Sequence, residues 1–509
     1  MYIWMEAYCM KPQNILFLFT DQQRYDTLEE LGNPIIKTPA LNRLVKEGVA
    51  FTRAYSPCPV CVPARYAMHT GQLPHRTNCT VNESMPDGRA SFMEILQEHG
   101  YQTHGVGKMH FTFTGKDGDT PWGFESRDYS EEGGLEDDFK AFLRENGYGH
   151  VHDPQGVRSE MYYIPQPSQL PAHLHNTHWV ADRSIDFLKR RDETRPFMLM
   201  TSFIKPHPPF ENPTPWNKLY RGPEMPLPKR PQDSEGLITY WNKFQNRYKY
   251  RDQGIDDHLF RAMKAAYYGA ISFVDYQIGR LLAYMEEAGL LDNTLILFSS
   301  DHGELLGDYH CVGKRSFLDA AARIPMIMVH PDLPKNVRCD KPVSLVDILP
   351  TFLQAANIEP KITYSGDSLI DIASGSVERE RIFAQYNREE YGVYMSVTER
   401  YKYMYSAPDD MEWLFDLKVD PDETRNLSNN LMYFDIKEEM KRGLIGFFQK
   451  EKYDTPLEGD DWRRYPVKRL PEDPDALLLF QDPPESIPHI PGYEREFSVN
   501  QASLFKVRF

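Results

Sequence analysis

Three continuous apolar runs, each followed by polar residues, set the strongest limit on how this chain folds. They cover residues 14–20, 196–203 and 293–300. Uninterrupted apolar runs of this length are typical of strands that are buried on both faces of a parallel sheet. The residues that follow these runs are Asp21 and Gln22, residues 205–207, and Asp301 and His302. Open α/β sheets bind ligands at the carboxyl ends of their strands, so we expect these polar side chains to lie close together.

Helical patterns separate the apolar runs and define the fold class. They cover residues 38–47, 91–99, 176–190 and 257–288. Alternating strands and helices predict an α/β domain of three layers, with a mixed, mostly parallel sheet and helices on both faces.

From about residue 376 the pattern changes to short aromatic strands with tight turns. These strands are expected at 381–386, 391–398, 401–405 and 413–416, followed by a helix at about 433–450. A chain of 509 residues is also too long for one compact core. We therefore expect a large α/β domain over residues 1–375. A smaller α+β subdomain, with an antiparallel sheet, a helix and an extended tail, should follow over residues 376–509.

Charge and the N-terminal residues limit the partners. The formal net charge of −16 argues against a general nucleic-acid binder and against a protein that binds anionic membranes. Residues 1–10 have no basic segment followed by an apolar core, and the apolar run at 15–19 is far shorter than a membrane span. We therefore expect a cytoplasmic protein with no nucleic-acid or membrane partner.

Cysteine usage points away from a disulfide-stabilised protein. The six cysteines stand at positions 9, 58, 61, 79, 311 and 339. So few cysteines in a long chain do not form a disulfide framework. Cys58 and Cys61 form a C-x-x-C pair, but no second pair completes a zinc site, and Pro63 with a helix-like run follows. Redox or zinc use of this pair is therefore disfavoured.

Residues 61–71 read C-V-P-A-R-Y-A-M-H-T-G. This segment resembles the signature of the type I sulfatases of the alkaline phosphatase superfamily, C-x-P/A-x-R followed by a spacer and Thr-Gly. The resemblance covers nearly the whole chain, and residues 414–427, L-F-D-L-K-V-D-P-D-E-T-R-N-L, are similar to the family's C-terminal pattern. Ala64 stands where eukaryotic members commonly have serine, which indicates the bacterial type. Several matching segments in the right order argue against a chance match.

The resemblance implies that a maturase oxidises Cys61 to formylglycine. The hydrated aldehyde offers a hard alkoxide for attack on sulfur or phosphorus, whereas a thiol is a soft nucleophile. One hydroxyl attacks, and the other later expels the bound sulfate. Arg65 is placed by the family against the modified residue and the metal ligands. On a helix, these two positions share one face near the N-terminus, where anions bind.

The resemblance also implies a site for one divalent cation. Its ligands would be Asp21, Gln22, Cys61, Asp301 and His302. An oxygen-rich site favours calcium. Histidine at 302 replaces the more common asparagine and moves the preference toward manganese, with magnesium as a further alternative.

Further residues match the family's cationic groups. Lys108 and His110 lie in G-K-M-H, similar to the family's G-K-W-H, where the lysine binds a sulfate oxygen and the histidine helps to restore the aldehyde. His207 matches the histidine that protonates the leaving oxygen or holds sulfate, and Lys314 matches a lysine that contacts the ester and the leaving group. Cations are needed because negative charge develops on the leaving oxygen. The implied catalytic residues are thus Cys61, Arg65, Lys108, His110, His207 and Lys314. The implied substrate-binding residues are Asn82, Lys108, His207 and Lys314. Supporting roles are expected for His69, Asp308 and His310.

Three functions agree with these motifs. The first is hydrolysis of sulfate esters, with a small carbohydrate sulfate as the preferred substrate. The second is hydrolysis of phosphonate or phosphate monoesters or diesters, because relatives with Asp-Gln and Asp-His metal pairs include phosphonate monoester hydrolases. The third is a non-catalytic binding protein with an unmodified Cys61. Residues that contact the leaving group are expected in loops 111–175 and 211–260, which contain Trp122, Tyr162, Tyr163, His173, His175, Trp216, Arg221, Trp241 and Arg247.

Overall fold

The computed structural model describes residues 13–82, 85–86, 88–111, 122–132, 136–158, 162–250 and 256–472. At its centre lies a nine-stranded sheet with the order β11-β2-β10-β8-β1-β6-β3-β4, and β9 pairs with β2. The strands are β1 (Asn14–Asp21), β2 (Val49–Tyr55), β3 (Gln102–Gly107), β4 (Ser126–Tyr129), β6 (Phe197–Pro206), β8 (Thr294–Ser300), β9 (Arg323–Ile324), β10 (Met326–Val329) and β11 (Val337–Ser344). Strands β9 and β10 run antiparallel to their neighbours, and the other pairs are parallel. The prediction of a mixed, mostly parallel sheet is confirmed.

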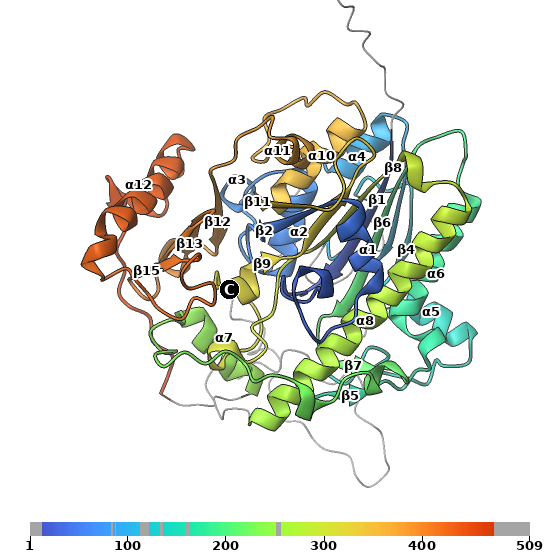
Figure 1. The fold of residues 1–509 in the computed structure, drawn as a ribbon, viewed down its shortest axis with the longest axis horizontal. Helices are drawn as coiled ribbons and strands as arrows, with labels where there is room; N and C mark the ends of the chain where they lie inside the picture. The colour runs from blue at the N-terminus through green and yellow to red at the C-terminus, as the bar shows by residue number, and fades with distance from the viewer. Residues whose placement is uncertain are drawn as a thin grey trace, which may run out of the picture.

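Helices cover both faces of this sheet (Figure 1). Side chains of β1 alternate between the two layers: Ile15, Phe17 and Phe19 join one apolar cluster, and Leu16 and Leu18 join the other. The first layer contains α2 (Cys61–Thr70), α4 (Phe92–Glu98), α10 (Ile348–Ala355) and α11 (Leu369–Ser374). The second contains α1 (Pro39–Glu47), α5 (Asp138–Glu145), α6 (Asn176–Arg190) and α8 (Asp257–Glu287). Burial on both faces explains why the sequence of β1 is apolar without alternation.

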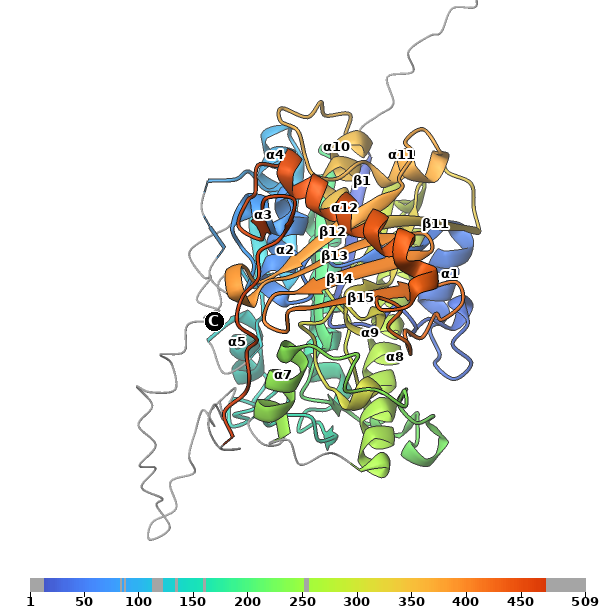
Figure 2. The same cartoon turned by 90° about the vertical axis from the view of Figure 1, so that its left-hand side faces the viewer.

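A second sheet forms the C-terminal part. Strands β12 (Arg381–Tyr386), β13 (Val393–Thr398), β14 (Tyr401–Ser406) and β15 (Met411–Asp416) pair in sequence order, all antiparallel. Helix α12 (Phe434–Lys450) lies across one face of these strands (Figure 2). The α+β character predicted for this part is confirmed, and we propose that the boundary between the two domains lies near residue 375.

The opposite face of the small sheet packs against the large domain. Met404 and Trp413 share an apolar cluster with Tyr55 and Phe317. Beside this cluster, the buried Lys402 ammonium pairs with the carboxylates of Asp319 and Glu423. Asp319 opens α9 (Asp319–Ala322) of the large domain, so this ion cluster links the two sheets.

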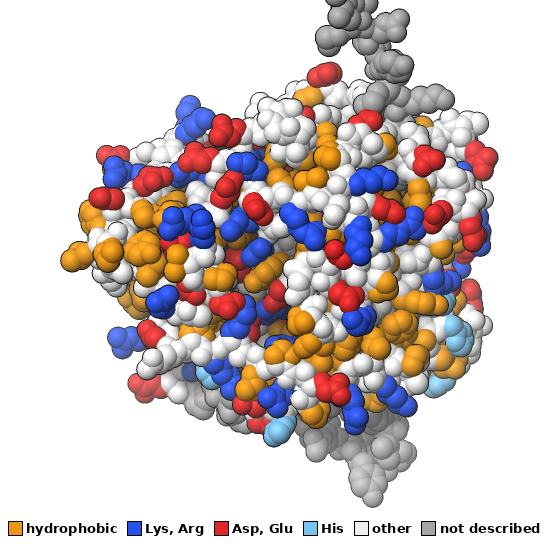
Figure 3. Space-filling view, viewed as in Figure 1, with side chains coloured by type: hydrophobic (Ala, Val, Ile, Leu, Met, Phe, Trp, Pro, Cys, Tyr) orange, Lys and Arg blue, Asp and Glu red, His pale blue; other side chains and the backbone are white. Residues whose placement is uncertain are grey.

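The described residues also form the remaining α-helices and short strands. They are α3 (Pro74–Thr77), β5 (Gln166–Pro167), β7 (Glu211–Asn212), α7 (Tyr240–Tyr250), β16 (Leu457–Glu458) and β17 (Asp461–Trp462). The extended tail expected from the sequence is described as far as residue 472, and the rest of it lies outside the described residues. Basic and acidic side chains are interspersed on the face drawn in Figure 3, so the net charge is not gathered into one patch there. Among the helices of the described ranges, none has both the length and the apolar character of a membrane span.

Candidate active site

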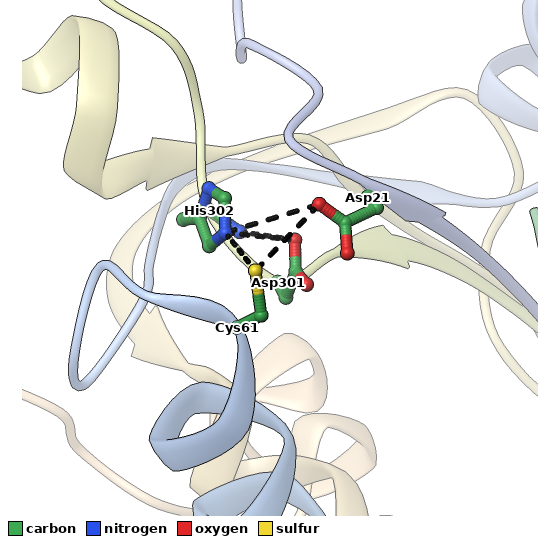
Figure 4. A group of neighbouring side chains, drawn as sticks. All are labelled: Asp21, Cys61, Asp301 and His302. Carbon is green, nitrogen blue, oxygen red and sulfur yellow. Dashed lines mark hydrogen bonds and ion pairs between the residues drawn. The ribbon is translucent and has the colours of Figure 1, made fainter. Parts of the chain in front are cut away.

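Neighbouring strands bring the predicted side chains to one edge of the large sheet. β1 lies between β6 and β8 and is parallel to both, so the carboxyl ends of the three strands meet. Asp21 ends β1, and Asp301 follows β8 directly. Helix α2 starts at Cys61 and directs its first turn toward these carboxylates (Figure 4). The polar side chains that follow separate strands therefore lie close together, and their role as one catalytic site stays a prediction.

Four side chains converge at this edge, with ligand atoms within 4.8 Å of one another: Asp21, Cys61, Asp301 and His302. His302 Nε2 lies 3.3 Å from Cys61 Sγ, 3.6 Å from Asp301 Oδ1 and 3.9 Å from Asp21 Oδ1. The other ring nitrogen, Nδ1, is 3.0 Å from the carbonyl oxygen of Gly303. A hydrogen bond from Nδ1 to this carbonyl leaves Nε2 as an acceptor facing the cluster, the usual second contact of a metal-binding histidine.

The electrostatics of this cluster fit a divalent cation. Burial, together with the neighbouring Asp21 carboxylate, raises the pKa of Asp301 to about 7. Burial also opposes ionisation of Asp21, but Lys108, His207 and Arg65 hold the pKa of this carboxyl well below its usual range. Burial lowers the pKa of His302 and so keeps the imidazole neutral. Two buried carboxylates beside a neutral imidazole form a donor set that a divalent ion satisfies.

Arg65 holds the two carboxylates in place. Its Nε donates to Asp301 Oδ2 at 3.0 Å, and its NH2 group donates to Asp21 Oδ2 at 3.1 Å. Its NH1 group donates to the backbone carbonyl of Lys108 and to the hydroxyl of Ser202. The guanidinium is fully buried. Arg65 therefore contacts both carboxylates of the cluster, and every one of its nitrogen atoms has a partner.

Two lysines flank the cluster. Lys108 Nζ lies 2.7 Å from Asp21 Oδ2. Lys314 Nζ lies 3.0 Å from Cys61 Sγ and donates to Gln22 Oε1 at 2.8 Å. The side-chain nitrogen of Gln22 donates to Glu304. Gln22 thus lies beside the cluster with its amide oxygen on Lys314, and its role as a metal ligand stays a prediction.

The environment of Cys61 does not activate a thiol. Burial and the neighbouring Asp21 carboxylate raise the pKa of Cys61 to about 11, although Lys314 and Lys108 act in the opposite direction. Thiolates are the reactive form of cysteine. In this pocket the unmodified side chain is therefore a protonated, weakly nucleophilic thiol near neutral pH.

Both predicted histidines reach the pocket. Burial and Lys108 lower the pKa of His110 to about 3, and its Nδ1 has no hydrogen-bond partner among the described residues. His207 Nδ1 lies 2.7 Å from the carbonyl oxygen of Pro208, while its Nε2 lies 4.0 Å from Asp21 Oδ1. Burial holds the pKa of His207 well below its usual value. Both rings are therefore neutral in the ligand-free protein.

Other predicted positions take different places. Asn82 Oδ1 accepts the backbone N–H of Val62 at 3.1 Å, so this side chain caps α2. His69 is buried against the rings of Phe92 and Phe111, with no polar partner for its ring nitrogens among the described residues. The expected supporting roles of Asp308 and His310 stay predictions: Asp308 Oδ2 pairs with Arg24 at 2.9 Å, and His310 is exposed.

Aromatic residues of the expected leaving-group loops divide into two groups. Tyr162 OH lies 3.5 Å from His207 Nε2, and Tyr163 OH donates to Glu304. Trp216 stacks on Phe273 of α8. Trp122, His175 and Trp241 likewise pack against other parts of the chain: Phe111, Glu211 and Tyr391. Most of these positions therefore support the fold, while the two tyrosines line the site.

Sequence reasoning missed one charged pair in the pocket. Glu132 contacts Lys108 and lies 3.2 Å from His207 Nδ1. Arg158 pairs with Glu132 at 3.3 Å. Neither residue belongs to a motif, because both lie in irregular loops that only the fold brings to the strand ends.

Comparisons with known proteins agree with this geometry. A family model described as Sulfatase matches residues 13–358, and one described as N-sulphoglucosamine sulphohydrolase, C-terminal, matches residues 307–450. An arylsulfatase of Clostridium perfringens is 31% identical over 466 residues, covering 86% of this chain and 94% of that protein. An N-acetylglucosamine-6-O-sulfatase of Bacteroides thetaiotaomicron is 26% identical over 525 residues, covering 88% and 89%.

Among solved structures, a phosphonate monoester hydrolase of Agrobacterium radiobacter superposes with a TM-score of 0.75 and 23% identity. The match covers 89% of this chain and 100% of that one, and it shows a shared fold. The sulfatase model spans well over half of the 509 residues and contains the strand ends and the helix that form the cluster. The chain therefore belongs to the sulfatase family, whose members are sulfuric ester hydrolases.

Proposed function

We propose that this chain hydrolyses sulfate esters with a formylglycine nucleophile, made from Cys61 by a maturase, beside a divalent metal ion. One observation carries the proposal: Cys61 opens α2 with its Sγ 3.3 Å from His302 Nε2 and 3.0 Å from Lys314 Nζ, inside a cluster of buried carboxylates. A sulfate ester is a hard electrophile, and the hydrated aldehyde supplies the oxygen nucleophile that a thiol lacks.

Asp21, Asp301, His302 and residue 61 would hold the metal, for which we favour calcium, with manganese and magnesium as alternatives. When bound, the ion supplies positive charge that stabilises an oxyanion at residue 61. Gln22 is the additional ligand that the family pattern implies.

The chain's own residues provide the remaining functions. Arg65 fixes the spacing of the two carboxylates through its separate contacts with Asp21 and Asp301. Lys108 and Lys314 bring ammonium groups to Asp21 and to residue 61, where they bind the ester oxygens and stabilise charge on the leaving oxygen.

Two neutral imidazoles complete the pocket. His207 uses Nδ1 for the Pro208 carbonyl, so Nε2 faces the cluster and is available to the leaving oxygen. His110 Nδ1 has no hydrogen-bond partner among the described residues and lies 3.9 Å from Glu132 Oε1, close to residue 61, which suits it for proton movement there.

The proposed substrate is a small carbohydrate sulfate. The relative from Bacteroides thetaiotaomicron is named for a sulfated amino sugar. The rings of Tyr162 and His207 lie next to each other, with centroids 6.1 Å apart, and Arg158 lies over the Tyr162 ring. Aromatic rings and a guanidinium beside the cluster suit a sugar that carries further anions.

Rates with matched substrates test this proposal. Sulfated mono- and disaccharides should be hydrolysed faster than nitrophenyl sulfate, and phenyl phosphonate should be the poorest substrate. A sulfate ester and a phosphonate both present tetrahedral oxyanions, so only the relative rates separate the two activities. Turnover of the phosphonate alone would refute the sulfatase proposal and support the phosphonate alternative.

A Cys61→Ala variant should fold normally and lose turnover, because it removes the modified side chain and keeps the rest of the site. Intact-mass analysis of matured wild-type protein should show a loss of about 18 Da for the aldehyde, one sulfur exchanged for oxygen and two hydrogens lost. Protein made without a maturase should keep the thiol and hydrolyse little. Full turnover by Cys61→Ala would end the proposal.

A further inference from the structure

The carboxylate of Glu132 lies among the groups that the proposed function assigns to the sulfate. One oxygen contacts Lys108 Nζ. The other lies 3.2 Å from His207 Nδ1 and 3.3 Å from the guanidinium of Arg158. The side chain is only 14% exposed, so these contacts form within the pocket and not on the surface.

The same carboxylate lies close to the proposed nucleophile. Ligand atoms of Glu132, His110 and Cys61 lie within 4.8 Å of one another. A bound sulfate ester must also place its sulfur beside residue 61 and at least one of its oxygens on Lys108. The two oxygens of a carboxylate match two oxygens of a sulfate in charge and in acceptor geometry. The Glu132 carboxylate and the sulfate group of the ester therefore cannot occupy this position at the same time.

The neighbouring Glu131 has a different set of partners from Glu132. Its side chain accepts the backbone N–H of Met109 at 2.7 Å and also that of His110, so it shapes the loop that carries Lys108 and His110. The described partners of Glu132 are instead side chains of the pocket. A structural role explains Glu131 but not Glu132.

Lys108 lies between Asp21 and Glu132, and Arg158 pairs with Glu132, so without Glu132 this part of the buried pocket would carry excess positive charge. In the ligand-free protein the charge of Glu132 balances Lys108 and Arg158. When an anionic ester enters, it can supply the same compensation. The contacts that Glu132 gives up are then made by the ester, and they form again after sulfate leaves.

We propose that Glu132 is an internal substitute for the ester's sulfate: it occupies Lys108 beside residue 61 in the free enzyme and is displaced when substrate binds. This inference rests on the proposed function only in the assignment of Lys108 to sulfate binding. It follows that Glu132 competes with inorganic sulfate, the product, and so weakens product inhibition.

The test compares Glu132→Gln with Glu136→Gln in matured, metal-loaded protein. Glu136 is an exposed residue that pairs with Arg144, so its change alters the net charge equally without touching the pocket. Calorimetric titration with inorganic sulfate should show about 10-fold tighter binding to Glu132→Gln. Glu136→Gln should bind sulfate as the wild type does. The inhibition constant of sulfate and the KM of a sulfate ester should fall in parallel for Glu132→Gln.

Equal or weaker sulfate binding by Glu132→Gln would overturn the inference, as would an increased KM, which would make Glu132 a substrate contact. A crystal structure of the wild type with sulfate provides a check that does not depend on how the variant folds. The Glu132 carboxylate should have left Lys108, and its persistence there beside bound sulfate would refute displacement. Tighter sulfate binding by Glu132→Gln, in a protein that hydrolyses no sulfate ester, would refute the proposed function but not the competition.

Discussion

At the scale of single residues, Arg65 determines the distance between the two carboxylates of the site. Asp21 and Asp301 arrive on different strands, and the same guanidinium donates to both. The planar fork of arginine allows this, whereas the single ammonium group of lysine cannot reach both carboxylates in the same geometry. The positive charge alone is therefore not sufficient at position 65.

We predict that Arg65→Lys weakens metal binding roughly 10- to 100-fold, because the carboxylates lose the partner that orients them. The metal-free protein should also lose about 2 kcal/mol of unfolding free energy, since buried acceptors are left without donors. Titration with Ca²⁺ and urea unfolding measure the two effects. Arg43→Lys is the control, because Arg43 pairs with Glu47 on a helix surface. Unchanged metal affinity in Arg65→Lys would show that the spacing is set by the strands alone.

The predicted residues that the fold brings together share a property. Asp21, Asp301 and Cys61 each stand at the end of a strand or at the start of a helix, where a local pattern marks the position. Glu132 and Arg158 reach the same pocket from irregular segments far along the chain, and no local pattern marks them. Only the tertiary fold determines which loop residues face the site, so these two residues could not be predicted from the sequence.

At the scale of elements, the strands that the sequence predicted are the long ones that are buried on both faces. β1, β6 and β8 are long and buried on both faces, so their sequences are continuously apolar. The edge-side strand β3 reads Q-T-H-G-V-G and has no such pattern. A side chain at Gly107 would meet the backbone carbonyl of Ser202, and its φ of +87° also favours glycine. Close packing of β3 against β6 thus requires glycine at position 107, and the sequence of β3 lacks the apolar pattern that predicts a strand.

Helix α2 provides an element whose start depends on a distant residue. Val60 precedes the helix and provides no side-chain cap, but Asn82 Oδ1 accepts the N–H of Val62 in the first turn. We predict that Asn82→Ala costs about 1 kcal/mol of unfolding free energy, because this buried N–H loses its acceptor. Asn82→Asp should restore most of the loss. Urea unfolding measures both variants.

Activity measurements separate this capping role from the substrate contact that the family pattern implies. A capping residue should leave KM close to the wild-type value in Asn82→Asp, which keeps the acceptor. An increased KM in both variants, with unchanged unfolding free energy, would assign Asn82 to substrate binding instead.

At the scale of the whole molecule, the C-terminal subdomain is joined to the large domain by buried polar contacts as well as apolar ones. Lys402, Asp319 and Glu423 form one such contact. Glu423 belongs to the run of residues 414–427 that carried the C-terminal resemblance. The sequence marked this run as a family pattern, but its function in linking two domains emerges only when both sheets are folded.

His75 of α3 forms a second contact between the domains and should make the stability of the molecule depend on pH. Its ring packs against Phe447, Phe448 and Tyr453 and lies 3.3 Å from Glu451. Burial lowers the pKa of His75 to about 4, although Glu451 opposes the shift. In the unfolded chain the pKa of histidine is about 6.5. Between pH 6.5 and pH 4, His75 is protonated in the unfolded chain but stays neutral in the folded protein. The free energy of unfolding therefore falls as the pH decreases from about 6.5 toward 4.

We predict that His75→Phe removes this contribution while preserving the aromatic packing. Between pH 7 and pH 4.5, the wild type should lose about 2 kcal/mol more unfolding free energy than the variant does. The other histidines are common to both proteins, so their contributions cancel in the comparison. Urea unfolding across this range measures the difference, with the exposed His173→Phe as control. Parallel pH profiles for wild type and His75→Phe would mean that the ring accepts a proton without leaving the interface.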